Sequence, residues 1–138
     1  MNKHDLPEEK QTVLITGAFD IMHVGHIEIL KYASTFGRVF VAIDFDSKIK
    51  EEKGPNRPFN TFQDRKKFLE AIVYVDTVIG FSSKEHLEQI CQVLTPAYRI
   101  VGMDWFGKPI VGEKWCRRLR YYDRVGNHST TRILEGIK

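Results

Sequence analysis

A buried strand that runs through a glycine turn into a helix constrains this chain more than any other segment. Residues 13–15 form an apolar run typical of a buried strand, Gly17 interrupts the run, and a helical pattern begins near His23. His23 and His26 lie one helical turn apart at this junction, with Gly25 between them. A helix N-terminus carries unpaired N–H groups and a partial positive charge, so the segment predicts a site for an anion such as phosphate.

The length and composition of the chain predict one soluble domain at 12–138, preceded by a flexible tail at 1–11. The 138 residues are 42% hydrophobic and 28% charged, which suits a single core. The net charge of +3 fits small anions as well as weak nucleic-acid binding, so it selects neither. We expect a cytoplasmic protein without a membrane partner, because the start is polar and no run reaches spanning length. Cys91 and Cys116 lack C-x-x-C spacing, which predicts free thiols.

Apolar runs alternate with helical patterns along the chain. We expect strands at about 12–16, 38–43, 77–80, 99–102 and 120–122, and helices at about 23–36, 61–72, 84–94, 114–119 and 130–136. In the first helix, Ile27, Leu30 and Ala33 define the predicted buried face. Residues 44–60 predict a long loop, with at most a short turn at 47–50. The alternation predicts an α/β fold with a Rossmann-like open parallel sheet of about five strands, helices on both faces, and ligands at the carboxyl ends of the strands.

The residues around the two histidines resemble a known family. Gly17–Asp20 followed by His23–His26 is similar to the HxGH signature of the cytidylyltransferase-like nucleotidyltransferases, and His128–Arg132 resembles their second signature, which opens the last helix. The resemblance covers about residues 12–137. It implies that a phosphate oxygen of a small phosphomonoester acceptor attacks the α-phosphorus of a nucleoside triphosphate and that pyrophosphate leaves. It also implies Mg²⁺ bound with the triphosphate, and a homodimer.

Two branches of this family match different parts of the chain. The pattern K-G-x-x-R-P-x-N-x-x-x-x-R from Lys53 to Arg65 is similar to the adenylyltransferase domain of heptose-phosphate enzymes that make ADP-heptose. Gly102–Trp105 and Arg124 look more like the glycerol-3-phosphate cytidylyltransferases, which make CDP-glycerol. That branch usually carries an arginine where Val73 stands. The resemblance therefore favours ATP and a sugar phosphate such as heptose 1-phosphate slightly over CTP.

The resemblance implies three groups of site residues. His23 and His26 would contact the triphosphate and stabilise the transition state, and Lys53 would close over the phosphates from a loop. The residues expected to bind the nucleotide are Thr16, Gly17, Ala18, Phe19, Gly25, Asp104, Arg124, Ser129, Thr130 and Thr131. Arg57 and Arg65 are weaker candidates for contacts to phosphate or acceptor. No metal ligands are expected, because the triphosphate itself can hold the ion.

Simpler structural roles compete with several of these assignments. The two histidines could cap the helix, Lys53 could be a solvated lysine in a charged run, and Arg65 could form a surface ion pair. Asp20 is expected to order its own loop by hydrogen bonding. Trp105 could line a base or acceptor pocket or belong to the core.

Two other functions compete with nucleotidyl transfer. One is a non-catalytic module that binds a nucleotide. The other is adenylation of the aminoacyl-tRNA-synthetase kind, which the chain disfavours because it lacks a tRNA-binding extension and a K-M-S-K-S loop. The basic stretch Arg117–Arg120 is short, so we expect no nucleic-acid partner.

Overall fold

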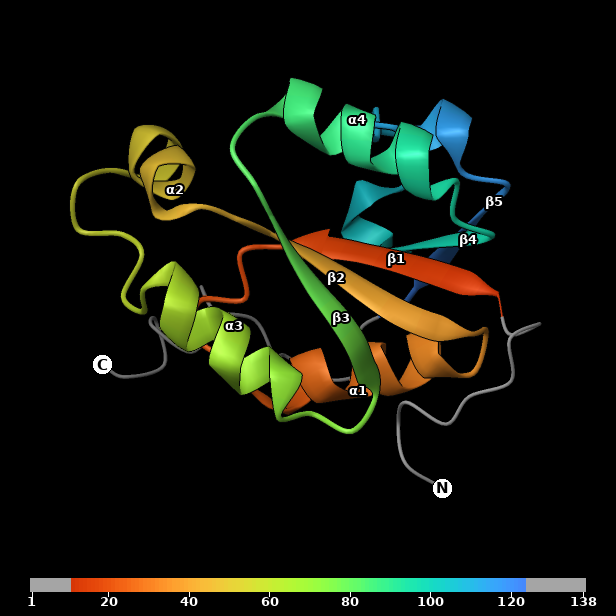
Figure 1. The fold of residues 1–138 in the computed structure, drawn as a ribbon, viewed down its shortest axis with the longest axis horizontal. Coiled ribbons are helices and arrows are strands. Elements are labelled where there is room, and N and C mark those ends of the chain that lie inside the picture. Colours follow the sequence, from red (N-terminus) through yellow and green to blue (C-terminus); the bar gives the residue numbers. More distant parts are fainter. Residues whose placement is uncertain (1–10, 124–138) are drawn as a thin grey trace.

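A parallel sheet of five strands forms the centre of the computed structural model, which describes residues 11–123 (Figure 1). The strands are β1 (Thr12–Gly17), β2 (Arg38–Asp44), β3 (Val75–Phe81), β4 (Tyr98–Gly102) and β5 (Arg118–Tyr122). Their order is β3-β2-β1-β4-β5, and every neighbouring pair is parallel. The predicted α/β class and the five parallel strands are therefore confirmed.

Helices cover both faces of the sheet, as the sequence predicts (Figure 1). They are α1 (Val24–Ser34), α2 (Asp46–Lys53), α3 (Phe62–Glu70) and α4 (Lys84–Leu94), with 3₁₀ turns η1 (Met103–Trp105) and η2 (Glu113–Trp115). Leu30 of α1 and Leu69 of α3 are buried with Val13 and Ile15, while Leu87 of α4 packs with the residues on the opposite face of β1. This alternation along β1 is the two-residue period of a strand that is covered on both faces.

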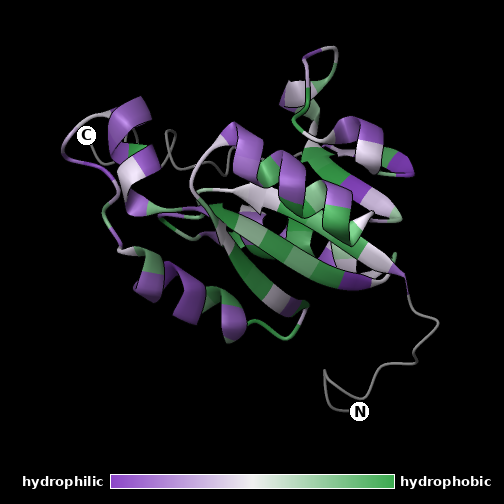
Figure 2. Cartoon of the chain, turned by 45° about the horizontal axis from the view of Figure 1, so that its top comes forward, coloured by the Kyte–Doolittle hydropathy of each residue, from purple (hydrophilic) through white to green (hydrophobic). Residues whose placement is uncertain are grey.

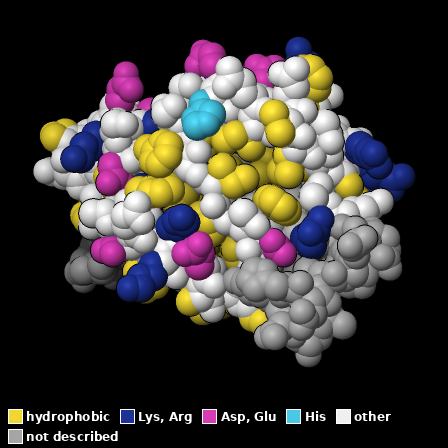
Figure 3. Space-filling view, viewed as in Figure 1, with side chains coloured by type: hydrophobic (Ala, Val, Ile, Leu, Met, Phe, Trp, Pro, Cys, Tyr) yellow, Lys and Arg dark blue, Asp and Glu magenta, His cyan; other side chains and the backbone are white. Residues whose placement is uncertain are grey.

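The distribution of apolar residues follows these layers. In Figure 2 the central strands are mostly hydrophobic, and hydrophilic residues gather on the helices. Figure 3 shows hydrophobic side chains near the middle of the face seen in Figure 1, with charged side chains around them. Within residues 11–123, no helix is long and apolar enough to span a bilayer.

The predicted long loop at 44–60 is wrong for its first half, because residues 46–53 form α2. This segment has no glycine or proline and buries Ile49. It carries Asp46 in its first turn and lysines in its last turn, where each charge interacts favourably with the helix dipole. Gly54 follows with φ of 100°, a conformation that suits glycine, and the helix ends there. Lys53 is thus the last residue of a helix and does not belong to a loop.

Two further details differ from the sequence prediction. Residues 114–119 are not a helix: η2 ends at Trp115, and β5 begins at Arg118, which pairs with Tyr98 of β4. In α1, Leu30 and Ala33 are buried as predicted, but Ile27 is 41% exposed. The predicted last helix at 130–136 and residues 1–10 of the predicted tail lie outside the described residues.

Candidate active site

A cavity of about 600 Å³ opens at the carboxyl ends of the strands. It lies where β1 is flanked by β2 on one side and β4 on the other. The chain runs outward from β1 to β3 and then crosses back to β4, so the direction of the strand order reverses at β1. Open parallel sheets bind their ligands at such a switch point. The cavity is lined by the end of β1, the start of α1, the length of α2 and the end of β4.

The two histidines form a reciprocal cap at the start of α1. His23 is the N-cap residue, and its Nδ1 accepts the backbone N–H of Gly25 at 3.0 Å. The Nδ1 of His26 accepts the backbone N–H of His23 at 3.1 Å. Because both Nδ1 atoms act as acceptors, each neutral ring carries its proton on Nε2. The ring centroids are 3.9 Å apart, and both side chains line the cavity.

The side chain of Phe19 anchors the loop between β1 and α1 in the hydrophobic core. Its side chain is 6% exposed, its φ is +49°, and its ring centroid lies 5.1 Å from that of His26. A Cβ atom at position 17 would lie 3.1 Å from the Phe19 ring. Gly17 therefore makes room for Phe19, in addition to the close ligand approach that the sequence suggests.

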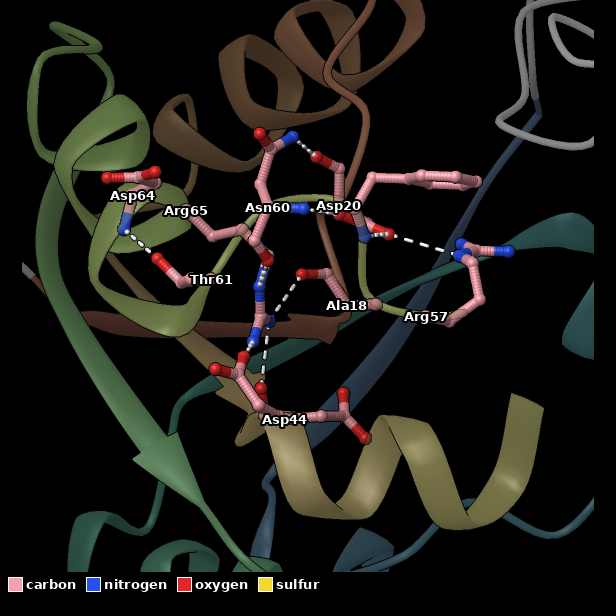
Figure 4. A network of polar contacts seen from close by, with 10 residues as sticks. Ala18, Asp20, Asp44, Arg57, Asn60, Thr61, Asp64 and Arg65 are labelled. Atoms are coloured by element: carbon pink, nitrogen blue, oxygen red, sulfur yellow. Dashed lines mark hydrogen bonds and ion pairs between the residues drawn. The ribbon is translucent and has the colours of Figure 1, made fainter. Parts of the chain in front are cut away.

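Asp20 ties the same loop to the segment that precedes α3 (Figure 4). Its buried carboxylate accepts the backbone N–H groups of Phe59 and Asn60 at 2.9 and 2.8 Å and the Nε–H of Arg57 at 3.1 Å. The loop-ordering role expected for Asp20 is confirmed. Arg57 is held at this carboxylate and is not among the residues that line the cavity.

Arg65 is a second tie between the same parts of the chain. Its side chain is fully buried, and Nη1 donates to the carbonyl oxygens of Ala18 and Asp44 at 2.9 and 2.8 Å (Figure 4). Nε donates to the carbonyl oxygen of Asn60 at 3.1 Å, and Nη2 pairs with the Asp46 carboxylate at 2.7 Å. Arg65 thus joins the loop after β1 and the end of β2 to α2 and α3. It does not form the surface ion pair that the sequence leaves open.

One wall of the cavity is the charged face of α2. The Nζ of Lys48 lies 2.8 Å from the carboxylate of Asp44 and also pairs with Glu52. Burial opposes the charge on Lys48, but these two hydrogen bonds outweigh it and raise the pKa of the ammonium group. Lys53 lies one turn further along, is exposed, and forms no ion pair with another described residue.

A buried arginine lies at the β4 side of the cavity. Arg99 is 2% exposed, and its Nη1 donates to the Val111 carbonyl oxygen at 2.8 Å. Nη2 lies 3.3 Å from the Thr16 hydroxyl, and Nη1 lies 3.8 Å from the sulfur of Cys91. The buried Nε has no hydrogen-bond partner among the described residues.

The structure brings most of the predicted site residues together. The predicted residues that line the cavity are Thr16, Gly17, Ala18, Phe19, His23, Gly25, His26, Lys53 and Asp104. Trp105 lines it too and is 49% exposed, so it does not belong to the core. Arg124, Ser129, Thr130 and Thr131 lie outside the described residues, and their roles stay predictions.

Several residues that line the cavity were not assigned to the site from the sequence, among them Lys48, Glu52 and Arg99. Lys48 and Glu52 were hidden in a charged run assigned to a loop, although their four-residue spacing is that of neighbours on a helix. Arg99 was assigned only to a strand. Its signal was a charge within the apolar run Arg99–Val101, where a buried strand rarely carries one.

A family comparison agrees with this geometry. The model of the cytidylyltransferase-like family matches residues 14–134. The chain belongs to the cytidylyltransferase-like family of nucleotidyltransferases. This confirms the family that the HxGH segment predicts.

Curated relatives extend over most of this chain. The bifunctional protein HldE of Sulfurimonas denitrificans is 36% identical over 130 residues, and that of Campylobacter fetus subsp. fetus is 38% identical over 130 residues. Both alignments cover 94% of this chain but only 27% and 28% of the relatives. The chain thus spans little more than a quarter of the length of the curated relatives that it matches.

Solved structures share the fold. A lipopolysaccharide core biosynthesis protein from Thermoplasma volcanium superposes with a TM-score of 0.66 at 19% identity, covering 86% of this chain and 99% of that one. Pantoate-beta-alanine ligase from Francisella tularensis gives 0.63 at 12% identity, covering 91% and 63%. Identities this low show the fold alone.

Proposed function

We propose that this chain transfers a nucleotidyl group from a nucleoside triphosphate to a small sugar phosphate such as heptose 1-phosphate, with release of pyrophosphate. The observation that carries the proposal is the reciprocal cap of His23 and His26 at the wall of the cavity. The backbone holds both Nδ1 atoms, so each ring has a fixed orientation and carries its proton on Nε2. Two fixed donors beside a helix N-terminus suit the charge that develops on a transferring phosphoryl group.

In this mechanism the histidines act as hydrogen-bond donors and need not be cations. A phosphate oxygen of the acceptor attacks the α-phosphorus, the bond to the bridging oxygen breaks, and pyrophosphate leaves. A phosphomonoester is largely ionised near neutral pH, so catalysis rests on alignment and charge stabilisation. Lys53 would contribute a cation from the end of α2, because no described carboxylate neutralises it.

Mg²⁺ enters the proposal with the triphosphate. Among residues 11–123, no group of three or more His, Cys, Asp or Glu side chains could hold a metal ion. Asp44 and Glu52 both face Lys48 instead. When bound, the ion would neutralise phosphate charge, and phosphate oxygens suit its preference for oxygen ligands.

The choice of ATP and a sugar phosphate rests on the segment from Lys53 to Arg65 and on the relatives named HldE. In the structure, Arg57, Asn60 and Arg65 of this segment hold the loop that leads to the histidines. CTP and glycerol 3-phosphate are the second candidate pair, favoured by Gly102–Trp105, of which Asp104 and Trp105 line the cavity. The homodimer stays a prediction, which size-exclusion chromatography with light scattering tests.

The test separates helix capping from catalysis by the histidines. Asn at position 23 keeps an N-cap acceptor, and Gln at position 26 keeps the capping box, but neither keeps the imidazole ring and its N–H donor. We expect His23→Asn and His26→Gln to fold as stably as the parent and to lower kcat by about 10²–10³-fold. Pyrophosphate release with ATP or CTP and a panel of phosphomonoesters is the assay.

Two outcomes would contradict the proposal. If the folded parent chain releases no pyrophosphate with any pair of nucleotide and acceptor, nucleotidyl transfer is wrong. If it then still binds ATP or CTP, and both variants only weaken that binding, the chain is a non-catalytic nucleotide-binding module. If turnover exists but both variants retain it, the histidines serve only as a cap.

A further inference from the structure

Two cysteines that are 25 positions apart meet beside Arg99. Cys91 lies on α4 and is fully buried, whereas Cys116 directly follows η2 and is half-buried. Cys116 packs against the apolar cluster that contains Cys91, and the Cys91 thiol donates a hydrogen bond toward the Cys116 sulfur. Neither cysteine has a role in the nucleotidyl transfer proposed above, and neither is among the residues that line the cavity.

The turn that carries Cys116 is fitted tightly over Cys91. Gly112 has φ of 78°, and a Cβ atom at this position would lie 2.5 Å from the Cys91 sulfur. The carbonyl oxygen of Gly112 lies 3.5 Å from the sulfur of Cys116. A larger residue at position 112 would therefore push the turn away from α4 and separate the two sulfurs.

The surroundings make the two thiols unequal. The hydrogen bond from Cys91 lowers the pKa of Cys116 to about 7 against its burial, and the Arg99 guanidinium acts in the same direction. The same hydrogen bond and burial raise the pKa of Cys91. Glu113 of η2 opposes ionisation of Cys116 but does not outweigh these contacts, and Glu88 of α4 opposes ionisation of Cys91 further.

We propose that Cys116 and Cys91 form a redox-active dithiol, in which Cys116 reacts with small-molecule disulfides and Cys91 resolves the adduct. The Cys116 thiolate attacks one sulfur of a reagent RS–SR, the S–S bond of the reagent breaks, and RS⁻ leaves. The Cys91 thiol then loses its proton to a departing thiolate and attacks the Cys116 sulfur. A second RS⁻ leaves, so two cysteines are oxidised to one intramolecular disulfide while RS–SR is reduced to two RSH.

The assignment of the two roles follows from exposure. Cys116 is a partly exposed residue that a reagent can approach, whereas Cys91 has no exposed surface. Attack therefore begins at Cys116, and the buried partner is already in contact for the second step. The alternative is that both cysteines are only small apolar residues of the α4 core, which would leave the pair unreactive in the folded chain.

The test treats the folded full chain with 2-hydroxyethyl disulfide, alkylates the remaining thiols, and measures intact and peptide masses. We expect the parent to lose two hydrogens, to take up no alkylating agent, and to give a peptide pair linked through Cys91 and Cys116. Cys91→Ala should stop at a stable mixed disulfide on Cys116. Cys116→Ser should leave Cys91 at least about tenfold less reactive than Cys116 in the parent, because of its burial.

The opposite results would overturn the inference. A parent chain that keeps two alkylatable thiols, or that keeps the reagent on Cys116 without forming the linked peptide, has no redox-active dithiol. Equal reactivity of Cys91 in Cys116→Ser and of Cys116 in the parent would show that the roles are wrong. The measurement on the parent chain tests the inference by itself, so the inference can fail even where a variant does not fold.

Discussion

Two buried arginines hold opposite sides of the cavity in different ways. Arg65 donates to the oxygens of Ala18, Asp44, Asn60 and Asp46 at distances between 2.7 and 3.1 Å. Arg99 has one short bond, to the Val111 carbonyl oxygen, and two longer contacts, one of them to sulfur. Its Nε is buried without a partner among the described residues. The two guanidinium groups have the same charge and almost the same burial, so they differ only in the number and kind of their hydrogen-bond acceptors.

The two sides of the cavity are therefore held by hydrogen bonds of different strength. On the side of α2 and α3, Arg65 fixes the loop of β1 through strong bonds to oxygens, one of them a charged carboxylate. On the side of β4, Arg99 has no carboxylate within ion-pair distance among residues 11–123, and its neighbours include the reactive cysteine pair. The histidines are thus held from the side of Arg65, while fewer short hydrogen bonds hold the side of Arg99.

Arg65→Met gives the largest effect expected from this comparison. The substitution keeps an unbranched side chain but leaves the carbonyl oxygens of Ala18 and Asp44 without their donor. We expect the free energy of unfolding to fall by about 3–5 kcal/mol, as when one partner of a buried charged network is removed. Urea denaturation followed by circular dichroism measures the change.

A neighbouring substitution provides the control for Arg65→Met. Lys67 is an exposed residue of the same helix, so Lys67→Met removes a positive charge from α3 without touching the buried network. Its free energy of unfolding should stay within about 0.5 kcal/mol of the parent. A similar loss in both variants would mean that Arg65 acts through helix charge and not through its four acceptors.

Arg99→Met should have a much smaller effect, of either sign. A buried charge without a carboxylate partner is costly to desolvate, and an apolar residue of similar volume removes that cost along with the bond to Val111. We expect the free energy of unfolding to change by no more than about 1 kcal/mol. A loss as large as that of Arg65→Met, in the same urea titration, would show that Arg99 is as firmly bonded as Arg65 and that the comparison fails.

The sequence predicts the sheet and the histidine junction well because both depend on local patterns. Apolar runs without alternation indicate strands that are covered on both faces, and α4 spans the predicted range 84–94, between its cap at Ser83 and Pro96. The contact between His23 and His26 likewise follows from their spacing of one helical turn. Such features need no knowledge of what lies across the fold.

The roles of Arg57 and Arg65 could not be predicted in this way. Both residues belong to a motif that suggests phosphate binding, yet their acceptors, Asp20 and Ala18, lie 37 and 47 positions away. A positive charge in a sequence does not show whether its partner is a ligand or a buried carbonyl oxygen. The same limit hid the contact between Cys91 and Cys116, which depends on how the turn at Gly112 packs on α4.

Lys48→Met tests whether the firm wall depends on more than Arg65, and its expected effect is the smallest. Asp44 is held twice, through its carbonyl oxygen by Arg65 and through its carboxylate by Lys48. Since the pKa of Lys48 is raised in the folded chain above its usual 10.5, its charge stabilises the fold below that pH and loses this effect as the pH rises through the folded value. We expect Lys48→Met to be less stable than the parent by about 0.5 kcal/mol at pH 8.

The pH dependence distinguishes the ion pairs of Lys48 from its packing. Urea titrations at about pH 8 and about pH 11.5 should show the gap between parent and Lys48→Met narrowing at the higher pH. Lys50→Met, which removes an exposed lysine from the same helix, should show no such gap at either pH. A gap that persists unchanged at the higher pH would mean that uncharged packing of the Lys48 side chain, whose Nζ lies 5.4 Å from the centroid of the Phe81 ring, supports the wall. The firm side of the cavity would then rest on Arg65 and apolar packing.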